Sequence, residues 1–264
     1  MKKTLSILVI STLLISCGEN DEPITDQEIP TFPAASTFLM DFSIVDANSG
    51  GRTLAKGNWG RSAIIVSAWS AAIGIYSAVP VASFQEAFNH EPTFDASIPG
   101  WVWEYDVTVL TTTYHARLES KVTFSGVEWK MLLSQDGSFQ DFNWYSGTSA
   151  LTGTRGTWTL NTDPLDPHPA IEIVWNRNAD QTTKDLTYTN IVPGDANNGG
   201  YISYEATDGV DYNKFYEIYN KEIENTTTIE WHSENKNGRV KDPEHYADED
   251  YHCWDDTLED ITCP

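Results

Sequence analysis

The sequence predicts a mostly β protein of the α+β class, in which an antiparallel meander of about ten strands is wrapped around one N-terminal apolar helix. Three observations predict it: many short segments with alternating apolar and polar residues, turn residues at near-regular spacing between them, and one long uncharged segment ahead of them. No helix-length segment interrupts the strands, which excludes a parallel sheet. The meander should form a curved sheet or a half barrel.

The helix is predicted from the 24 residues between Arg61 and Glu86, none of which is charged. This segment has the length of a membrane span, but it is rich in Ser and Ala, contains Gly74 and is interrupted by Pro80. We therefore interpret it as a helix buried inside the folded domain rather than as a span.

Asn58 is a suitable N-cap, and Pro80 should end this helix and begin a second one over residues 81–89. Because the first helix is apolar on all sides, we expect other structure to surround it. The residues expected inside the sheet are Ile65, Trp69, Ile73 and Tyr76.

Ten segments have the alternation of half-buried strands. In the first of them, Trp101, Trp103 and Tyr105 alternate with Glu104 and Asp106. Gly, Pro, Asn and Asp between the segments mark the turns. The ten segments are 101–109, 114–124, 127–133, 139–145, 156–160, 170–176, 185–191, 201–206, 213–219 and 226–233.

The chain begins like an export signal. Lys2 and Lys3 give a positive start, residues 5–15 are uncharged, and the small residue Ser16 precedes Cys17. The apolar run is too short to cross about 30 Å of hydrocarbon as a stable helix. An ordinary secretory signal followed by a chance cysteine is the alternative interpretation.

Residues 14–17, Leu-Ile-Ser-Cys, resemble the lipobox of bacterial lipoproteins, and the acidic residues 18–23 resemble the stretch that sorts Bacteroidetes lipoproteins to the cell surface. The resemblance implies a signal peptide over 1–16 and a Cys17 that carries acyl chains such as palmitate. It also implies a flexible tether over 17–33, with the protein anchored in the outer membrane. The cell surface is the expected side, and the periplasmic face is the alternative.

The composition separates a domain over 34–241 from a C-terminal segment over 242–264, which holds nine acids and no lysine or arginine. Removing Lys2 and Lys3 with the signal takes the formal net charge from −23 to −25. Such a surface repels nucleic acid, although plain solubility also explains it. Cys253 and Cys263 should form a disulfide in an oxidising compartment, since a metal site would need more ligands of the right type.

Candidate chemical sites each have a simpler explanation. No nucleophile elbow, phosphate loop, zinc motif or dinucleotide fingerprint is present. A catalytic carboxylate pair could come from Glu104, Glu119, Glu128, Glu172 and Glu205, or these could be solvated strand residues. A sugar- or lipid-binding surface could use Trp101, Trp103, Trp129, Trp144, Trp158 and Trp175, or these could pack in the core.

Calcium is the one cofactor considered, and its candidate ligands are Asp248, Asp250, Asp255 and Asp256, which could equally belong to a solvated tail. The loop 195–200 lacks the EF-hand ligand pattern. Thr257, in Asp-Thr-Leu, resembles the Bacteroidetes O-glycosylation site.

The predicted architecture resembles the lipoprotein-carrier fold of the LolA type and lipocalin-like barrels, and residues 156–158 resemble the lipocalin Gly-x-Trp motif. Three functions remain open. The first is a non-enzymatic binding or accessory subunit of an envelope complex, with an outer-membrane protein as partner. The second is a carrier of an apolar ligand, and the third is a glycan hydrolase that uses paired strand carboxylates.

Overall fold

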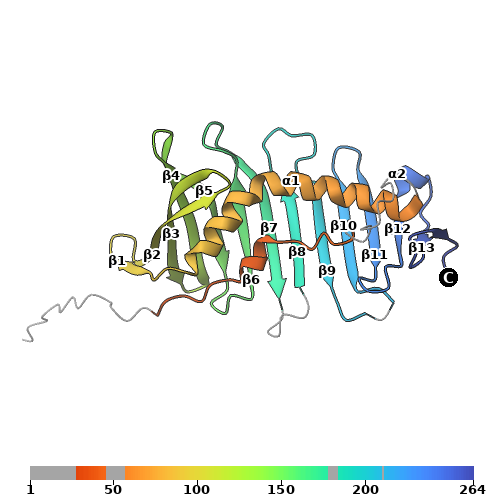
Figure 1. The fold of residues 1–264 in the computed structure, drawn as a ribbon, viewed down its shortest axis with the longest axis horizontal. Coiled ribbons are helices and arrows are strands. Elements are labelled where there is room, and N and C mark those ends of the chain that lie inside the picture. Colours follow the sequence, from red (N-terminus) through yellow and green to blue (C-terminus); the bar gives the residue numbers. More distant parts are fainter. Residues whose placement is uncertain (1–27, 46–56, 178–183, 210) are drawn as a thin grey trace, which may run out of the picture.

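The computed structural model describes residues 28–45, 57–177, 184–209 and 211–264. Fourteen strands form one antiparallel sheet, and each strand pairs with its neighbours along the chain, in the order β1 to β14. Within the described residues the sheet does not close, because β1 and β14 lie at its opposite edges (Figure 1). The predicted antiparallel meander packed against an N-terminal helix is confirmed.

The strands predicted from alternation are the long ones, β2 to β11. The remaining four have only two to four residues each, which is too short for alternation to show. The strands are β1 (Thr93–Asp95), β2 (Gly100–Val109), β3 (Thr112–Thr123), β4 (Gly126–Gln135), β5 (Phe139–Ser149), β6 (Arg155–Asn161), β7 (Pro169–Arg177), β8 (Lys184–Asn190), β9 (Tyr201–Ala206), β10 (Lys214–Asn220), β11 (Asn225–Trp231), β12 (Gly238–Lys241), β13 (His252–Trp254) and β14 (Asp260–Ile261).

Helix α1 (Gly57–Ala87) crosses one face of the sheet. Its 31 residues span about 46 Å at 1.5 Å each, which is the width of about ten strands. It begins beside β12 to β14 and ends over β2, so it runs against the strand order. The hydroxyl of Tyr105 in β2 donates to the Ser83 carbonyl at 2.5 Å near the end of the helix.

The prediction that Pro80 ends the helix is wrong, because α1 continues through it. A proline inside a helix lacks the N–H that would bond to the carbonyl four residues earlier, and its ring crowds that carbonyl. Burial on both sides of the proline offsets this cost: Ile73 before it and Phe84 after it both pack into the core, and Pro80 itself is buried. Tertiary packing therefore overrides the local signal.

The N-terminal segment 28–45 lies on the same sheet face beside α1 and includes the short helix η1 (Ala35–Phe38). The sheet holds this segment through hydrogen bonds to its backbone. The hydroxyls of Tyr188 and Tyr216 donate to the carbonyls of Phe38 and Asp41, both at 2.6 Å. Phe32, in the segment expected to be a tether, stacks on Trp129 at 5.3 Å, so the packed part of the chain begins before residue 34.

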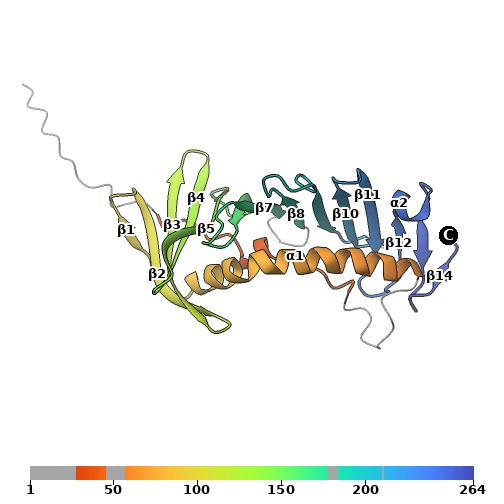
Figure 2. The ribbon, with the colours of Figure 1, turned by 90° about the horizontal axis from the view of Figure 1, so that it is seen from above.

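Seen from above, α1 lies along one side of the sheet (Figure 2). The opposite face carries the polar residues of the alternating strands, such as Glu104 and Asp106 in β2, which are exposed. The core therefore lies in a single layer between the sheet on one side and α1 with segment 28–45 on the other.

Candidate functional site

One side of α1 packs against the sheet. Its fully buried residues include Ala63, Val66 and Phe84, each 0% exposed. Phe84 contacts Phe38 and Trp158 with ring centroids 5.1 and 5.5 Å away. This packing fixes which side of the helix faces away from the sheet.

The other side of α1, which we call the outward face, is apolar and exposed. Ile75 is 77% exposed and Ile64 is 44% exposed. Small residues fill the surface around them, and the exposed ones are Ala68, Ala71, Ala72, Gly74 and Ala78. In the most apolar stretch of 18 residues of α1, only 22% of the stretch is buried. A contiguous apolar surface, such as the one that the described residues leave uncovered here, is typical of an interaction site.

The expectation that other structure surrounds α1 is therefore wrong. Of the four residues predicted to lie inside the sheet, Ile73 is buried at 4% exposure. Ile65, Trp69 and Tyr76 are only partly buried. The physical reason is that the sheet stays open, so it can cover only one side of the helix. By length and composition α1 could also cross a membrane, but here its buried side packs on the sheet.

A groove of about 290 Å³ lies between α1 and the β7 and β8 ends of the sheet. Trp69 and Tyr76 line it from the helix, together with Ala68 and Ala72 of the outward face. Asn190 and Asp195 line its polar rim, where the Asn190 amide donates to the Asp195 carboxylate at 3.3 Å. The groove therefore extends the outward face with aromatic surface.

The amino end of α1 is held by residues from the other end of the chain. A carboxylate oxygen of Asp260 accepts a hydrogen bond from the Asn58 backbone N–H at 2.7 Å, and the Asn58 side chain donates to the Cys253 carbonyl at 2.9 Å. Asn58 was expected to be the N-cap, but Asp260 fills that role. One turn later, Arg61 pairs with Asp242, which is fully buried, at 2.7 Å. The start of the outward face is thus rigidly placed.

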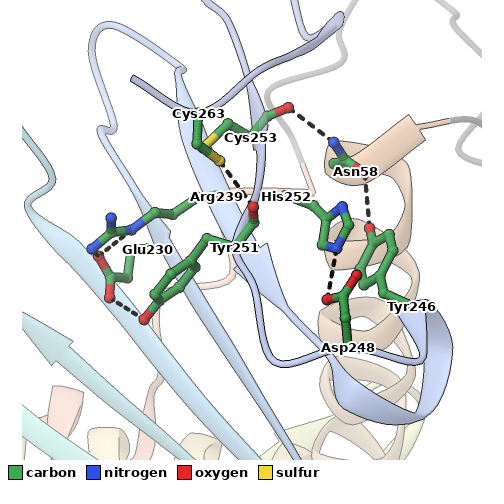
Figure 3. The surroundings of a disulfide bond; sticks show 9 residues. All are labelled: Asn58, Glu230, Arg239, Tyr246, Asp248, Tyr251, His252, Cys253 and Cys263. Atoms are coloured by element: carbon green, nitrogen blue, oxygen red, sulfur yellow. Dashed lines mark hydrogen bonds and ion pairs between the residues drawn. A yellow bond between two sulfur atoms is a disulfide. The ribbon is translucent and has the colours of Figure 1, made fainter.

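The C-terminal segment 242–264 is part of the fold, where it forms α2 (Pro243–Tyr246), β13 and β14. The predicted disulfide between Cys253 and Cys263 is confirmed, with Cα atoms 5.1 Å apart (Figure 3). Tyr246 stacks on His252 with ring centroids 3.6 Å apart, and its hydroxyl donates to the Asn58 side chain. Burial, followed by the nearby charges of Asp260 and Asp242, raises the pKa of Tyr246 to about 12.

Two of the five candidate catalytic glutamates lie close together on the polar face of the sheet. Glu104 and Glu119 each accept a hydrogen bond from Arg117 at 2.8 Å, and Asp95 accepts a third at 3.1 Å. Hydrogen bonds from Ser97, and then from Arg117, lower the pKa of Asp95. Arg117 therefore joins Glu104, Glu119 and Asp95 in one ion-pair cluster on this face. Glu128, Glu172 and Glu205 lie on other strands of this face.

Most of the candidate ligand-binding tryptophans are core residues. Trp103, Trp129, Trp158 and Trp175 are 0 to 2% exposed. Only Trp101 and Trp144 are partly exposed, and Trp144 belongs to a cluster with Tyr114, whose ring centroid is 5.6 Å away. Core packing therefore explains the high aromatic content of the strands.

The calcium candidates do not converge. Asp248 accepts hydrogen bonds from the Asp250 backbone and the His252 ring, and Asp255 accepts from the Thr257 backbone and side chain. Among the described residues, no three His, Cys, Asp or Glu side chains form a metal-binding group. Thr257 is exposed in the turn between β13 and β14, while Cys17 lies outside the described residues.

The outward face of α1, with its adjoining groove, is thus the most conspicuous surface of the molecule. No family model, curated protein or solved structure matches this chain. Its function must be inferred from its own surface. Sequence reasoning missed the outward face because α1 is apolar on every side, so its pattern does not distinguish the covered side from the exposed one.

Proposed function

We propose that the protein is a non-enzymatic lipoprotein of the outer membrane, a subunit of an envelope complex that binds a protein partner through the outward face of α1. The observation that carries the proposal is the exposure of Ile64 and Ile75 on a helix without a charged residue between Arg61 and Glu86. Apolar surface of this kind gains free energy when a partner removes it from water, by about 25 cal/mol per Å².

The chemistry of the face supports a protein partner. Its alanines and Gly74 let another backbone approach closely, as at helix–helix interfaces. A helix that lies on a membrane surface usually carries Lys or Arg on its flanks. Here the net charge of −25 after signal removal instead repels anionic head groups. Cys17, the proposed lipid attachment site, lies only eleven residues before Glu28, the first described residue. The lipid would therefore keep the domain close to the membrane and beside other envelope proteins.

The other two functions have less support. A carrier of an apolar ligand needs an enclosed cavity, and the groove beside Trp69 is at the lower limit of ligand pockets, which hold about 300–1,000 Å³. A glycan hydrolase needs two carboxyl groups that face a substrate across a cleft, whereas the carboxylates of Glu104 and Glu119 both pair with Arg117.

Site-specific photo-crosslinking in the native envelope tests the proposal. A photoreactive residue at Ile75 should give discrete protein adducts that mass spectrometry can identify. The same residue at Thr228, on the polar face of the sheet, is the matched control and should give none. Ala72→Glu, beside the crosslinker, should abolish the adducts from position 75. Adducts with lipid only, or equal adducts from both positions, would contradict a protein-binding role for the outward face.

A further inference from the structure

Six apolar residues of the outward face recur at alternating steps of four and three residues. They are Ile64, Ala68, Ala71, Ile75, Ala78 and Ala82. The first five are exposed, whereas Ala82, at the end of the stripe, is partly buried and also packs against the core. Such spacing places side chains on one stripe of a helix and is the heptad pattern by which two helices pack along their length. The described residues leave the first five positions of this stripe open, although they cover the opposite side of α1.

When two copies of the stripe run antiparallel and cross at the level of Ile73, large residues of one copy face small residues of the other. In an antiparallel pair of α1 helices, Ile75 of one copy faces Ala71 of the other, and Ile64 faces Ala82. Ala68 faces Ala78. Alternation of large and small residues across an interface lets the layers interdigitate without voids. In a parallel pair each position would face itself, so the isoleucines would meet each other and the alanines would leave gaps.

We infer that the partner of the outward face is a second copy of this chain. The two α1 helices pack antiparallel, and the two-fold axis between them crosses the helices at the level of Ile73. This inference rests on the proposed function and names the partner. Each Ile75 enters the hole that Ala68, Ala71, Ala72 and Ile75 form on the other copy, as a knob does in a coiled coil. The contact is isologous, so one self-complementary stripe serves both copies. No charge lies inside it to be desolvated.

The course of the chain favours the antiparallel arrangement independently. Helix α1 runs across the strands, so the two-fold axis of an antiparallel pair lies parallel to the strands (Figure 1). This axis keeps corresponding ends of the two sheets on the same side. Thr31 and Phe32 lie against Gly153 in the turn between β5 and β6, at one such end.

Both copies of that end therefore point in one direction. With Cys17 lipidated as proposed, both anchors reach the same membrane. A parallel pair has its axis along α1, and this axis would turn the two N-terminal segments to opposite sides. Attachment to one membrane and the large-to-small pairing thus select the same geometry.

The first measurement is the mass in solution of the full chain with Cys17→Ala, which removes the proposed anchor. Light scattering after size exclusion should give twice the monomer mass, which is 29.6 kDa for the full sequence. Ile75→Glu should give a monomer and raise the dissociation constant at least about a hundredfold, because the glutamate would be buried in the apolar hole. Thr228→Glu carries the same charge change on the polar face and should stay dimeric.

Cysteine crosslinking then tests the direction of packing. A mixture of Ala68→Cys and Ala78→Cys chains should form a disulfide between positions 68 and 78, whereas Ala68→Cys alone should not, because ten residues of helix, about 15 Å, separate the two copies of position 68 in the antiparallel pair. A crosslink between two Ala68→Cys chains would indicate parallel packing and overturn the inference. A monomer at every concentration would also overturn it. The proposed function would then survive only if photo-crosslinking from position 75 still identified another protein, and the absence of any adduct would remove both.

Discussion

Asp260 reaches the first turn of α1 from a strand that lies 202 residues later than Asn58. The first N–H groups of a helix have no partner within the helix, and a carboxylate there also interacts favourably with the helix dipole. Asp260 stands in β14, which pairs with β13 at Cys253, and the disulfide to Cys263 closes this hairpin. The disulfide therefore supports a helix cap that is supplied from outside the helix.

Asp260→Ala should lower the free energy of unfolding by about 1 kcal/mol, the usual effect of losing an N-cap. Denaturant unfolding measures this change. Asp256→Ala removes an exposed acid from the turn that precedes β14 and should have little effect. In a Cys253→Ser, Cys263→Ser background the effect of Asp260→Ala should shrink, because β14 is no longer held. Equal effects in both backgrounds would show that the disulfide does not position the cap.

Sequence reasoning succeeded for the cysteines and failed for the cap, for physical reasons. Two cysteines in a chain expected to be exported have few partners, so Cys253 and Cys263 could be paired from their number and spacing alone. Asp260 carries no such signal, because its partner is a backbone N–H that only the folded sheet brings near. Asn58 has the sequence character of a cap, but a residue that supplies one from far along the chain cannot be identified locally.

The two sides of α1 should respond differently to truncation. Phe84→Ala should cost about 3–5 kcal/mol, because Phe84 is 0% exposed among other aromatic rings. Ile75→Ala should change the stability of the monomer by no more than about 0.5 kcal/mol, because Ile75 is 77% exposed. Denaturant unfolding measures both changes, at protein concentrations below the dissociation constant of the proposed dimer. A large loss for Ile75→Ala in the monomer would mean that the outward face is covered by the chain itself.

At the scale of elements, the alternation of apolar and polar residues predicted strands correctly where the strands are long and one face of the sheet is exposed to solvent. Strand β2 illustrates this, since Trp103, Tyr105 and Val107 are buried while Glu104 and Asp106 are exposed. The same reasoning cannot decide how far a sheet curves. A closed sheet would have covered α1, whereas the open one leaves its outward face exposed, although the strand sequences are compatible with either outcome.

The whole molecule has the shape of a long single sheet with two short edges. Strand β1 has three residues and β14 has two. A strand edge exposes unpaired backbone groups that can recruit further strands, and short edge strands limit this risk. Growth of the sheet by edge pairing is therefore disfavoured, which leaves the outward face of α1 as the main surface for association.

Cys17→Ala should move the protein from the membrane fraction to the soluble fraction. Helix α1 is the one described helix long and apolar enough to span a bilayer, and its buried side is occupied by the sheet. Fractionation of cells that express the parent and the variant measures the effect, with Cys17→Ser as a second variant. If Cys17→Ala still required detergent, adding Ile75→Glu would show whether the outward face holds the protein on lipid instead.

Helix α1 runs in the direction opposite to the order of the strands, and this affects the order in which the parts of the fold can pack during synthesis. Synthesis delivers α1 before any of the fourteen strands. The end of the helix meets β2, one of the first strands to appear, whereas its beginning meets β12, β13 and β14, the last. If the sheet forms in chain order, α1 packs onto it from Ala87 towards Gly57. Its first turn becomes secure only when the final residues of the chain have arrived.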